Sequence, residues 1–186
     1  MRSEDTFDGL ITGRGHTWVA LVAMHDKRVG LKDVNSFFGN LRNGGNYEGL
    51  WTCVKDDNTV WYGARNGVTF GRFDKNNPQV FGNKLERGQW TVLAGRMPAG
   101  LATVKLELFV NEPLAVAVTD FPVHPTANPG RMAVGQERDA IEHPGVESFD
   151  GELARLLMWE RPLSDAELAR VLKRLSSEIH SKPEPK

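Results

Sequence analysis

The 186-residue sequence has a single cysteine, Cys53, so no disulfide forms within the chain and cysteine use does not reveal its compartment. It has no apolar run long enough to span a bilayer, which argues against membrane insertion. No strong charge imbalance is present, since 23 Lys and Arg face 24 Asp and Glu, so bulk charge gives no reason to expect a nucleic acid as partner. No apolar signal segment follows Met1. If the protein is exported, its signal is expected to lie outside this sequence.

Most of the chain consists of short apolar segments separated by turn-forming residues. Residues 16–25 are apolar at both alternating sets of positions, which predicts a strand covered on both faces. In residues 104–110 apolar and charged side chains alternate, which predicts a strand with one buried and one solvent-exposed face. Arg65-Asn66-Gly67 separates the apolar runs 59–64 and 68–73 and predicts a hairpin turn. Many short strands with a single helix indicate an all-β fold, a two-sheet antiparallel sandwich.

The length suits one domain with a substantial core. We expect residues 1–15 to be a loosely ordered leader, residues 16–180 to form the domain, and residues 181–186 to be a disordered tail. Residues 33–47 are too rich in Asn and Gly for a regular strand.

A strand and a helix are joined near the C-terminal end. Residues 153–159 are apolar with one charge, which predicts a short buried strand. Ser164 and Glu167 match a Ser-x-x-Glu capping box, so a helix is expected over residues 165–179. Its apolar side chains fall on one face, which predicts that the helix packs against a larger body.

This joint consists of Phe149-Asp150-Gly151, an apolar strand, and Arg161-x-Leu163-Ser164-x-x-Glu167-Leu168. It resembles the C-terminal signature of laminin G-like modules in the concanavalin A-like lectin/glucanase superfamily. Upstream, residues 88–94 and 106–111 resemble the family's paired central strands, although Asn111-Glu112-Pro113 stands where the family usually has Asn-Gly. The resemblance implies a jelly-roll sandwich with a short C-terminal helix.

The most specific catalytic hypothesis rests on three carboxylates, Glu137, Asp139 and Glu142. Laminarinase-type glycanases of the same fold carry a similar Glu-x-Asp-x-x-Glu pattern, in which one glutamate is the nucleophile and the other the general acid/base. In this chain His143-Pro144-Gly145 follows at once and no tryptophan lies within the segment, so a solvated loop is the favoured interpretation. A glycoside hydrolase that acts on β-glucans through Glu137 and Glu142 is the alternative.

Calcium is the one metal ion for which the sequence offers candidate ligands. Many laminin G-like modules hold Ca²⁺ at the rim of the sandwich, and the ion takes about six to eight oxygen ligands. The candidate ligands are Asp56, Asp57 and Asp74, which lie in turn-like segments. Since turns are themselves rich in Asp and Asn, a structural role is the favoured interpretation, and no other cofactor is expected.

The candidate ligand surface lies in an aromatic and amide-rich region. Sugar-binding surfaces combine a flat aromatic ring with amide and guanidinium groups, because the CH faces of a sugar stack while its hydroxyls need hydrogen-bond partners. Trp61 and Tyr62 are neighbours on a predicted strand, so they face opposite sides and at most one of them lines a given face. The candidate ligand-binding residues are Asn43, Asn46, Tyr47, Trp51, Asn58, Trp61 and Arg65.

We interpret the chain as a non-catalytic binding or interaction module that recognises a carbohydrate or a protein surface. The resemblance implies that it is part of a larger cell-envelope or secreted protein, and therefore an extracytoplasmic location. A purely structural spacer is a further alternative. The ligand, the parent protein, the oligomeric state and the role of Cys53 stay open at this point.

Overall fold

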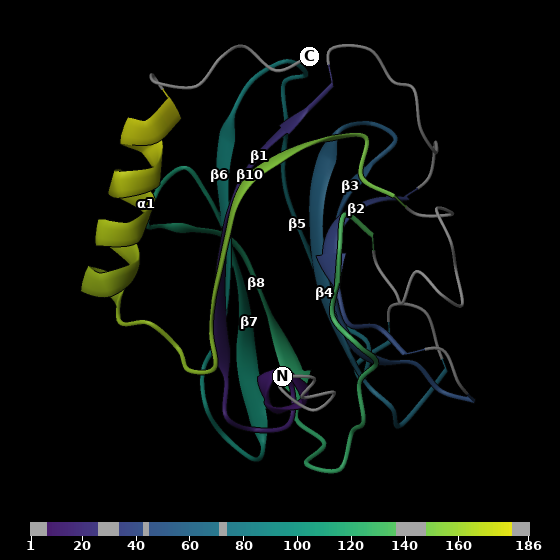
Figure 1. Ribbon diagram of the computed structural model, residues 1–186. Coiled ribbons are helices and arrows are strands. Elements are labelled where there is room, and N and C mark those ends of the chain that lie inside the picture. Colours follow the sequence, from purple (N-terminus) through teal and green to yellow (C-terminus); the bar gives the residue numbers. More distant parts are fainter. Residues whose placement is uncertain (1–6, 26–33, 43–44, 71–73, 137–147, 180–186) are drawn as a thin grey trace.

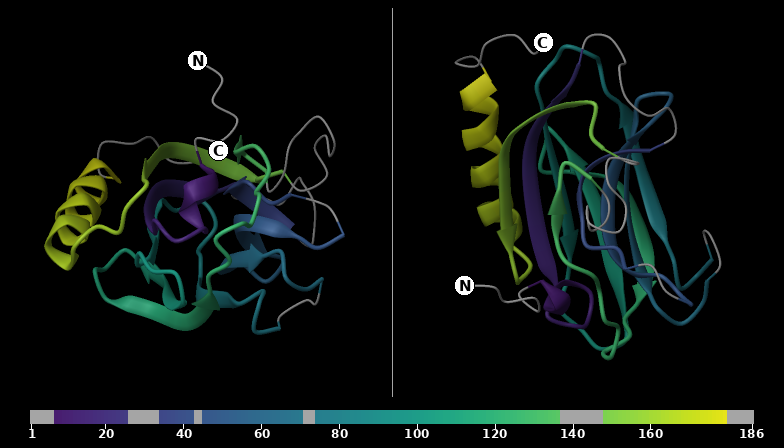
Figure 2. Two further views of the ribbon diagram at one scale, coloured as in Figure 1. Left: turned by 90° about the horizontal axis from the view of Figure 1, so that it is seen from below. Right: turned by 45° about the vertical axis from the view of Figure 1, so that its right-hand side comes forward.

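The computed structural model describes residues 7–25, 34–42, 45–70, 74–136 and 148–179 (Figure 1). In these residues the chain forms two five-stranded sheets that face each other, with a helix standing outside them (Figure 2). The elements in chain order are η1 (Asp8–Leu10), β1 (His16–Met24), β2 (Val34–Gly39), β3 (Glu48–Lys55), β4 (Thr59–Asn66), β5 (Gln79–Lys84), β6 (Thr91–Met97), β7 (Thr103–Val110), β8 (Ala115–Pro122), β9 (Ala133–Val134), β10 (Gly151–Trp159) and α1 (Asp165–Ile179).

The two sheets are called sheet A and sheet B. Sheet A has the strand order β10-β1-β6-β7-β8, and sheet B has the order β5-β4-β3-β2-β9. Neighbouring strands of both sheets pair antiparallel. The predicted all-β, two-sheet antiparallel sandwich with a C-terminal helix is therefore confirmed.

Aromatic side chains fill the centre of the core between the sheets. Trp18 on β1 meets Phe38 of β2 and Tyr62 of β4 edge to face, with ring centroids 5.3 and 5.2 Å apart. Edge-to-face pairs are favourable because the positive edge of one ring meets the negative face of the other. Strand β1 is buried along its whole length, as its doubly apolar pattern predicted, because one face meets sheet B and the other meets the helix.

Helix α1 covers the outer face of sheet A. The backbone amide of Ser164 donates a 2.8 Å hydrogen bond to the Glu167 carboxylate, and the Glu167 amide donates a 3.3 Å bond to the Ser164 hydroxyl. This reciprocal pair confirms the predicted capping box. The buried face of the helix packs on β1, β6 and β7 through a cluster that contains Leu168, Leu172, Leu175, Val19, Leu21, Val92, Ala94 and Phe109.

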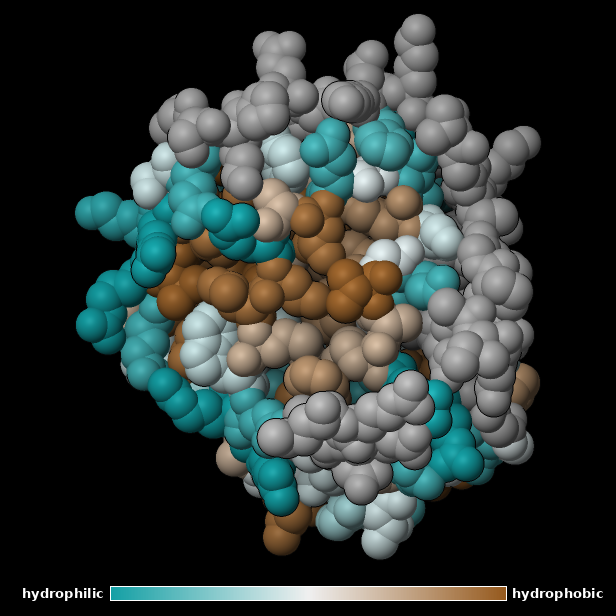
Figure 3. Space-filling view, in the orientation of Figure 1, coloured by the Kyte–Doolittle hydropathy of each residue, from teal (hydrophilic) through white to brown (hydrophobic). Residues whose placement is uncertain are grey.

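Strand β10 is the edge strand of sheet A and is half-buried, not buried as predicted for residues 153–159. Among the described strands it pairs only with β1 and has no strand neighbour on its other side, and Arg155 is exposed. Figure 3 shows apolar side chains gathered in the middle of the face along which β10 runs in Figure 1. The apolar run therefore reflects a strand that contacts both the core and the helix from an edge position.

Two strand predictions are wrong. The expected hairpin at Arg65-Asn66-Gly67 does not form, because β4 continues to Asn66 and the next strand, β5, begins only at Gln79. Residues 68–70 are not in a strand, and residues 71–73 lie outside the described part. Strand β2 forms at Val34–Gly39, in the segment where no regular strand was expected.

Residues 7–15 pack as part of the domain, although the sequence suggested a leader over residues 1–15. Leu10 and Ile11 are fully buried in the inter-sheet core, next to the short helix η1. Residues 1–6 and 180–186, which include the predicted tail, lie outside the described part. Among the described helices none is long and apolar enough to cross a membrane.

Candidate functional site

The outer face of sheet B carries a row of aromatic rings. Val60, Tyr62 and Ala64 of β4 point into the inter-sheet core, so the alternate residues of this strand point outward. We call the row the aromatic band, and it consists of Tyr47, Trp51, Trp61, Phe70 and Phe81 together with the cations Lys55 and Arg65.

The accessible end of the aromatic band is a stacked pair. Trp61 on β4 lies directly opposite Phe81 on β5, and their rings are 6.0 Å apart at an angle of 26°. Phe81 is 43% exposed and Trp61 is partly exposed. The Lys55 ammonium lies 5.2 Å from the centre of the Phe81 ring, and no described carboxylate pairs with it. This end of the aromatic band therefore combines two stacked, partly exposed rings with an ammonium group over one of them.

The middle of the aromatic band is buried and fixed. Trp51 is 1% exposed and stands perpendicular to Trp61, with ring centroids 5.8 Å apart. It lies over Gly63 on the neighbouring strand, where a Cβ atom would overlap the indole ring. The Arg65 guanidinium lies between two rings, 4.6 Å from the centroid of Tyr47 and 5.3 Å from that of Trp51. These cation–π contacts hold the rings in place.

Of the predicted ligand residues, the structure brings four into one row: Tyr47, Trp51, Trp61 and Arg65. Trp61 and Tyr62 face opposite sides as predicted, because Tyr62 is fully buried between the sheets.

The predicted asparagines have other contacts. The Asn46 amide donates to the backbone carbonyl of Gly67 at 2.8 Å, which braces the end of β4. Asn58 has a positive φ of 70° and closes the turn between β3 and β4. Both therefore serve turn geometry, for which Asn is well suited. Asn43 lies outside the described residues.

Three members of the aromatic band were missed from the sequence: Phe81, Phe70 and Lys55. Phe81 was missed together with its strand. The available signal was the pair Val80-Phe81, in which the first side chain enters the core and the second points outward. Lys55 was missed because a lysine at the end of a strand is common and does not by itself indicate a binding site.

The predicted calcium ligands do not come together. Asp57 lies in the turn before β4, where hydrogen bonds from the Thr59 side chain and backbone lower its pKa to about 2. Asp74 lies in the segment before β5, and the hydrogen bond from the Thr69 hydroxyl at 2.6 Å lowers its pKa. Asp56 is an exposed neighbour of Asp57. The carboxylates of Asp57 and Asp74 act as acceptors within turns, and no cluster of three or more metal-binding side chains occurs among the described residues.

The predicted catalytic carboxylates Glu137, Asp139 and Glu142 lie outside the described residues. The glycanase hypothesis therefore stays a prediction from the sequence.

No protein-family model and no curated protein matches the sequence. Among solved structures, the chain is similar to the CBM40 of the Ruminococcus gnavus IT-sialidase bound to α2,3-sialyllactose, with a TM-score of 0.64, 17% identity, and coverage of 89% of this chain and 86% of that chain. It is also similar to the heptameric SAP-like pentraxin of Limulus polyphemus, with a TM-score of 0.57, 19% identity, and coverage of 86% and 70%. A third similar structure is the NanB sialidase of Streptococcus pneumoniae, with a TM-score of 0.61 and 17% identity, where 86% of this chain matches 24% of that chain.

At such identities the likeness shows the fold alone. The CBM40 and the pentraxin are both concanavalin A-like jelly rolls, and this chain has the same fold. The predicted jelly-roll fold is thereby confirmed. Neither of these two structures is named as a laminin G-like module, so that finer assignment stays a prediction.

Proposed function

We propose that this chain is a non-catalytic carbohydrate-binding module that holds its ligand on the accessible end of the aromatic band. One observation carries the proposal: Trp61 and Phe81 form a stacked, partly exposed pair on two adjacent strands, with the Lys55 ammonium over the Phe81 ring. Such a pair presents exposed aromatic surface next to a hydrogen-bond donor.

The chemistry of this surface suits a sugar. The CH face of a pyranose packs on an aromatic ring, and a neighbouring ammonium donates to hydroxyl or carboxylate oxygens. Because both rings stand on strands and Trp51 braces Trp61 from the side, the pair is ordered before the ligand arrives. Preorganised rings lose little conformational entropy on binding, which favours affinity.

The similar structures support a carbohydrate ligand. The CBM40 is described as bound to sialyllactose in two linkages, and it matches most of this chain. Sialidases supply several of the matches, and in NanB the matched part is a minor share of a longer chain. By this analogy we infer that the module belongs to a larger extracytoplasmic protein. A protein surface as the ligand is the alternative within the same class of binding module.

A glycan array tests the proposal, followed by calorimetric titration with each glycan that binds. We expect at least one glycan to bind, and Phe81→Ala and Trp61→Ala to weaken that binding by at least about tenfold, since one lost stacking contact of about 1.4 kcal/mol has this effect. Leu114→Ala is the matched control, because Leu114 is 78% exposed in the turn between β7 and β8 of sheet A. It should leave the affinity unchanged.

Two outcomes would contradict the proposal. In the first, no glycan on a broad array binds the folded protein, which leaves a protein ligand or a spacer role. In the second, a glycan binds but Phe81→Ala and Trp61→Ala keep the affinity of the unaltered chain, which places the sugar elsewhere on the surface.

A further inference from the structure

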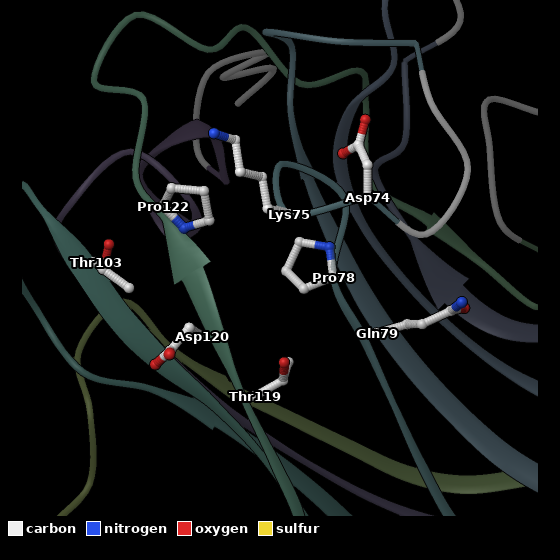
Figure 4. A pocket seen from close by; sticks show the side chains of 8 residues that line it. All are labelled: Asp74, Lys75, Pro78, Gln79, Thr103, Thr119, Asp120 and Pro122. Atoms are coloured by element: carbon white, nitrogen blue, oxygen red, sulfur yellow. The ribbon is translucent and has the colours of Figure 1, made fainter.

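A separate cavity of about 510 Å³ opens between the edge strands of the two sheets, where the end of β8 faces the start of β5 (Figure 4). Its volume lies within the range of about 300–1,000 Å³ that is usual for small-molecule sites. The cavity is lined by Asp74, Lys75, Pro78, Gln79, Thr103, Thr119, Asp120 and Pro122.

The two walls of the cavity are tied together by one buried side chain. The Asn66 amide nitrogen donates a 2.8 Å hydrogen bond to the carbonyl of Pro122 on β8 and lies 3.4 Å from the side-chain oxygen of Asn76, in the segment before β5. Asn66 is 2% exposed. The backbone of the Asp74 segment is held as well, since the Asp74 carboxylate accepts from the Asn76 amide at 2.8 Å. The cavity is therefore a fixed feature of the fold.

The two carboxylates around the cavity are already engaged in local contacts. Asp120 pairs with Lys105 at 2.6 Å. Asp74 accepts hydrogen bonds from Thr69, Asn76 and Asn77. Both carboxylates already accept hydrogen bonds from neighbouring side chains, and Lys75 is the single cation of the lining. This arrangement of charged side chains favours an uncharged ligand.

Three polar groups of the lining are free to serve such a ligand. No described residue pairs with the hydroxyls of Thr103 and Thr119 or with the ammonium of Lys75. Pro78 and Pro122 stand on opposite sides of the space and offer apolar ring faces (Figure 4). Hydroxyl and ammonium donors between apolar faces match a molecule with many hydroxyls and CH faces.

We propose that this cavity is a second ligand site, which takes one ring of a neutral sugar. The site is independent of the aromatic band, because its polar groups come from the β4–β5 segment, β7 and β8. A chain with both sites would hold two points of a branched glycan or two separate chains, and the second contact would raise the overall avidity.

Amide NMR of the whole chain tests this site with defined probes: methyl α-mannopyranoside, methyl β-galactopyranoside and methyl β-glucopyranoside, with N-acetylneuraminic acid as the charged comparison. We expect at least one neutral glycoside to cause saturable shifts of the Lys75, Thr119 and Asp120 amides at millimolar concentration. Thr119→Val keeps the shape of the side chain and removes the hydroxyl, and it should weaken the affinity about fivefold, the effect of one hydrogen bond. Thr126→Val, at an exposed loop position, is the matched control and should change nothing.

The outcomes separate this site from the aromatic band. Shifts at the cavity that persist in Phe81→Ala support the second site even where the band binds nothing. Shifts confined to Trp61 and Phe81 overturn the second site and leave the proposed function intact. The absence of saturable shifts with all three neutral glycosides, or an equal response to N-acetylneuraminic acid at the cavity, also overturns it.

Discussion

The Nε2 atom of His16 lies 2.5 Å from the hydroxyl oxygen of Tyr62, and both side chains are fully buried between the sheets. The Nδ1 atom of His16 lies 2.6 Å from the carbonyl oxygen of Leu10. Because a carbonyl only accepts, Nδ1 carries the proton, and the Tyr62 hydroxyl donates to Nε2. This contact joins β1 of sheet A to β4 of sheet B and fixes the neutral form of the imidazole.

The stability of the protein should fall as the pH drops from 7 to 5. Burial lowers the pKa of His16 from 6.5 to about 4, so below pH 6.5 the unfolded chain binds a proton that the native state does not. The free energy of unfolding should decrease by about 2 kcal/mol by pH 5 and by about 3 kcal/mol once the pH reaches 4. Urea denaturation at a series of pH values measures this loss.

His124→Gln is the control, because it leaves the buried imidazole of His16 in place, and its free energy of unfolding should fall with pH as in the unaltered protein. His16→Gln should be less stable at pH 7, and its free energy of unfolding should depend less on pH. A free energy of unfolding that stays constant between pH 7 and pH 5 in the unaltered protein would contradict the assigned protonation state.

Removal of the helix cap should weaken the docking of α1. Ser164→Ala deletes the hydroxyl that accepts from the Glu167 amide, and we expect a loss of about 1 kcal/mol in the free energy of unfolding. Ser177→Ala, on the exposed side of the same helix, is the matched control and should be neutral or slightly stabilising. Equal effects of the two substitutions would show that the capping box does not matter.

The aromatic band should not tolerate a side chain at position 63. Gly63→Ala places a methyl group inside the ring of Trp51, which is buried and cannot swing away, so we expect a loss of about 1–3 kcal/mol and a changed tryptophan fluorescence spectrum. Gly45→Ala has no atom within 4 Å of the new methyl group and should leave the spectrum unchanged. An unchanged spectrum and stability in Gly63→Ala would contradict the packing of this part of sheet B.

Arg96 should contribute more to stability than other surface ion pairs. Its guanidinium contacts the Glu107 carboxylate at 2.6 Å, the Asp165 carboxylate at 2.7 Å and the carbonyl of Leu163 at 3.1 Å, and so joins sheet A to the start of the helix. Arg96→Lys keeps the charge but loses the planar fork, and we expect it to cost about 1–2 kcal/mol. Arg14→Lys alters an exposed pair and should cost less than about 0.5 kcal/mol. Thermal denaturation of both variants measures the difference, and equal losses would argue against the role of Arg96.

The sequence predicted the strands that follow a regular pattern and missed those that break it. In β2 the pairing register shifts between Ser36 and Phe38, so Phe37 and Phe38 both enter the core, and the alternation of apolar and polar positions disappears. In β5 a glycine, Gly82, allows the close approach of Val60 and of residues on β7, so the strand carries few apolar side chains. Bulges and the close packing of side chains against a glycine depend on tertiary structure, which local patterns do not encode.

The residues of the candidate site, like the strands, were predictable from the sequence only in part. Trp51, Trp61 and Arg65 stand out as residue types, and their strand spacing places them on one face. Phe81 joins them only through the pairing of β4 with β5, which spans a connection that the sequence indicated to be a tight hairpin. The asparagines were indistinguishable from ligand-binding residues by type, because the same amide group serves both turns and sugars.

The central claim is that Trp61 and Phe81 bind a carbohydrate, and the indole N–H signals of the five tryptophans test it most directly. In an amide and indole NMR titration with an array-positive glycan, the Trp61 signal should shift and saturate. The signal of Trp18, which is fully buried between the sheets, should stay in place as an internal reference. The shift of the Trp61 signal should be lost in Phe81→Ala. A glycan that saturates the protein without moving the Trp61 signal would contradict the account.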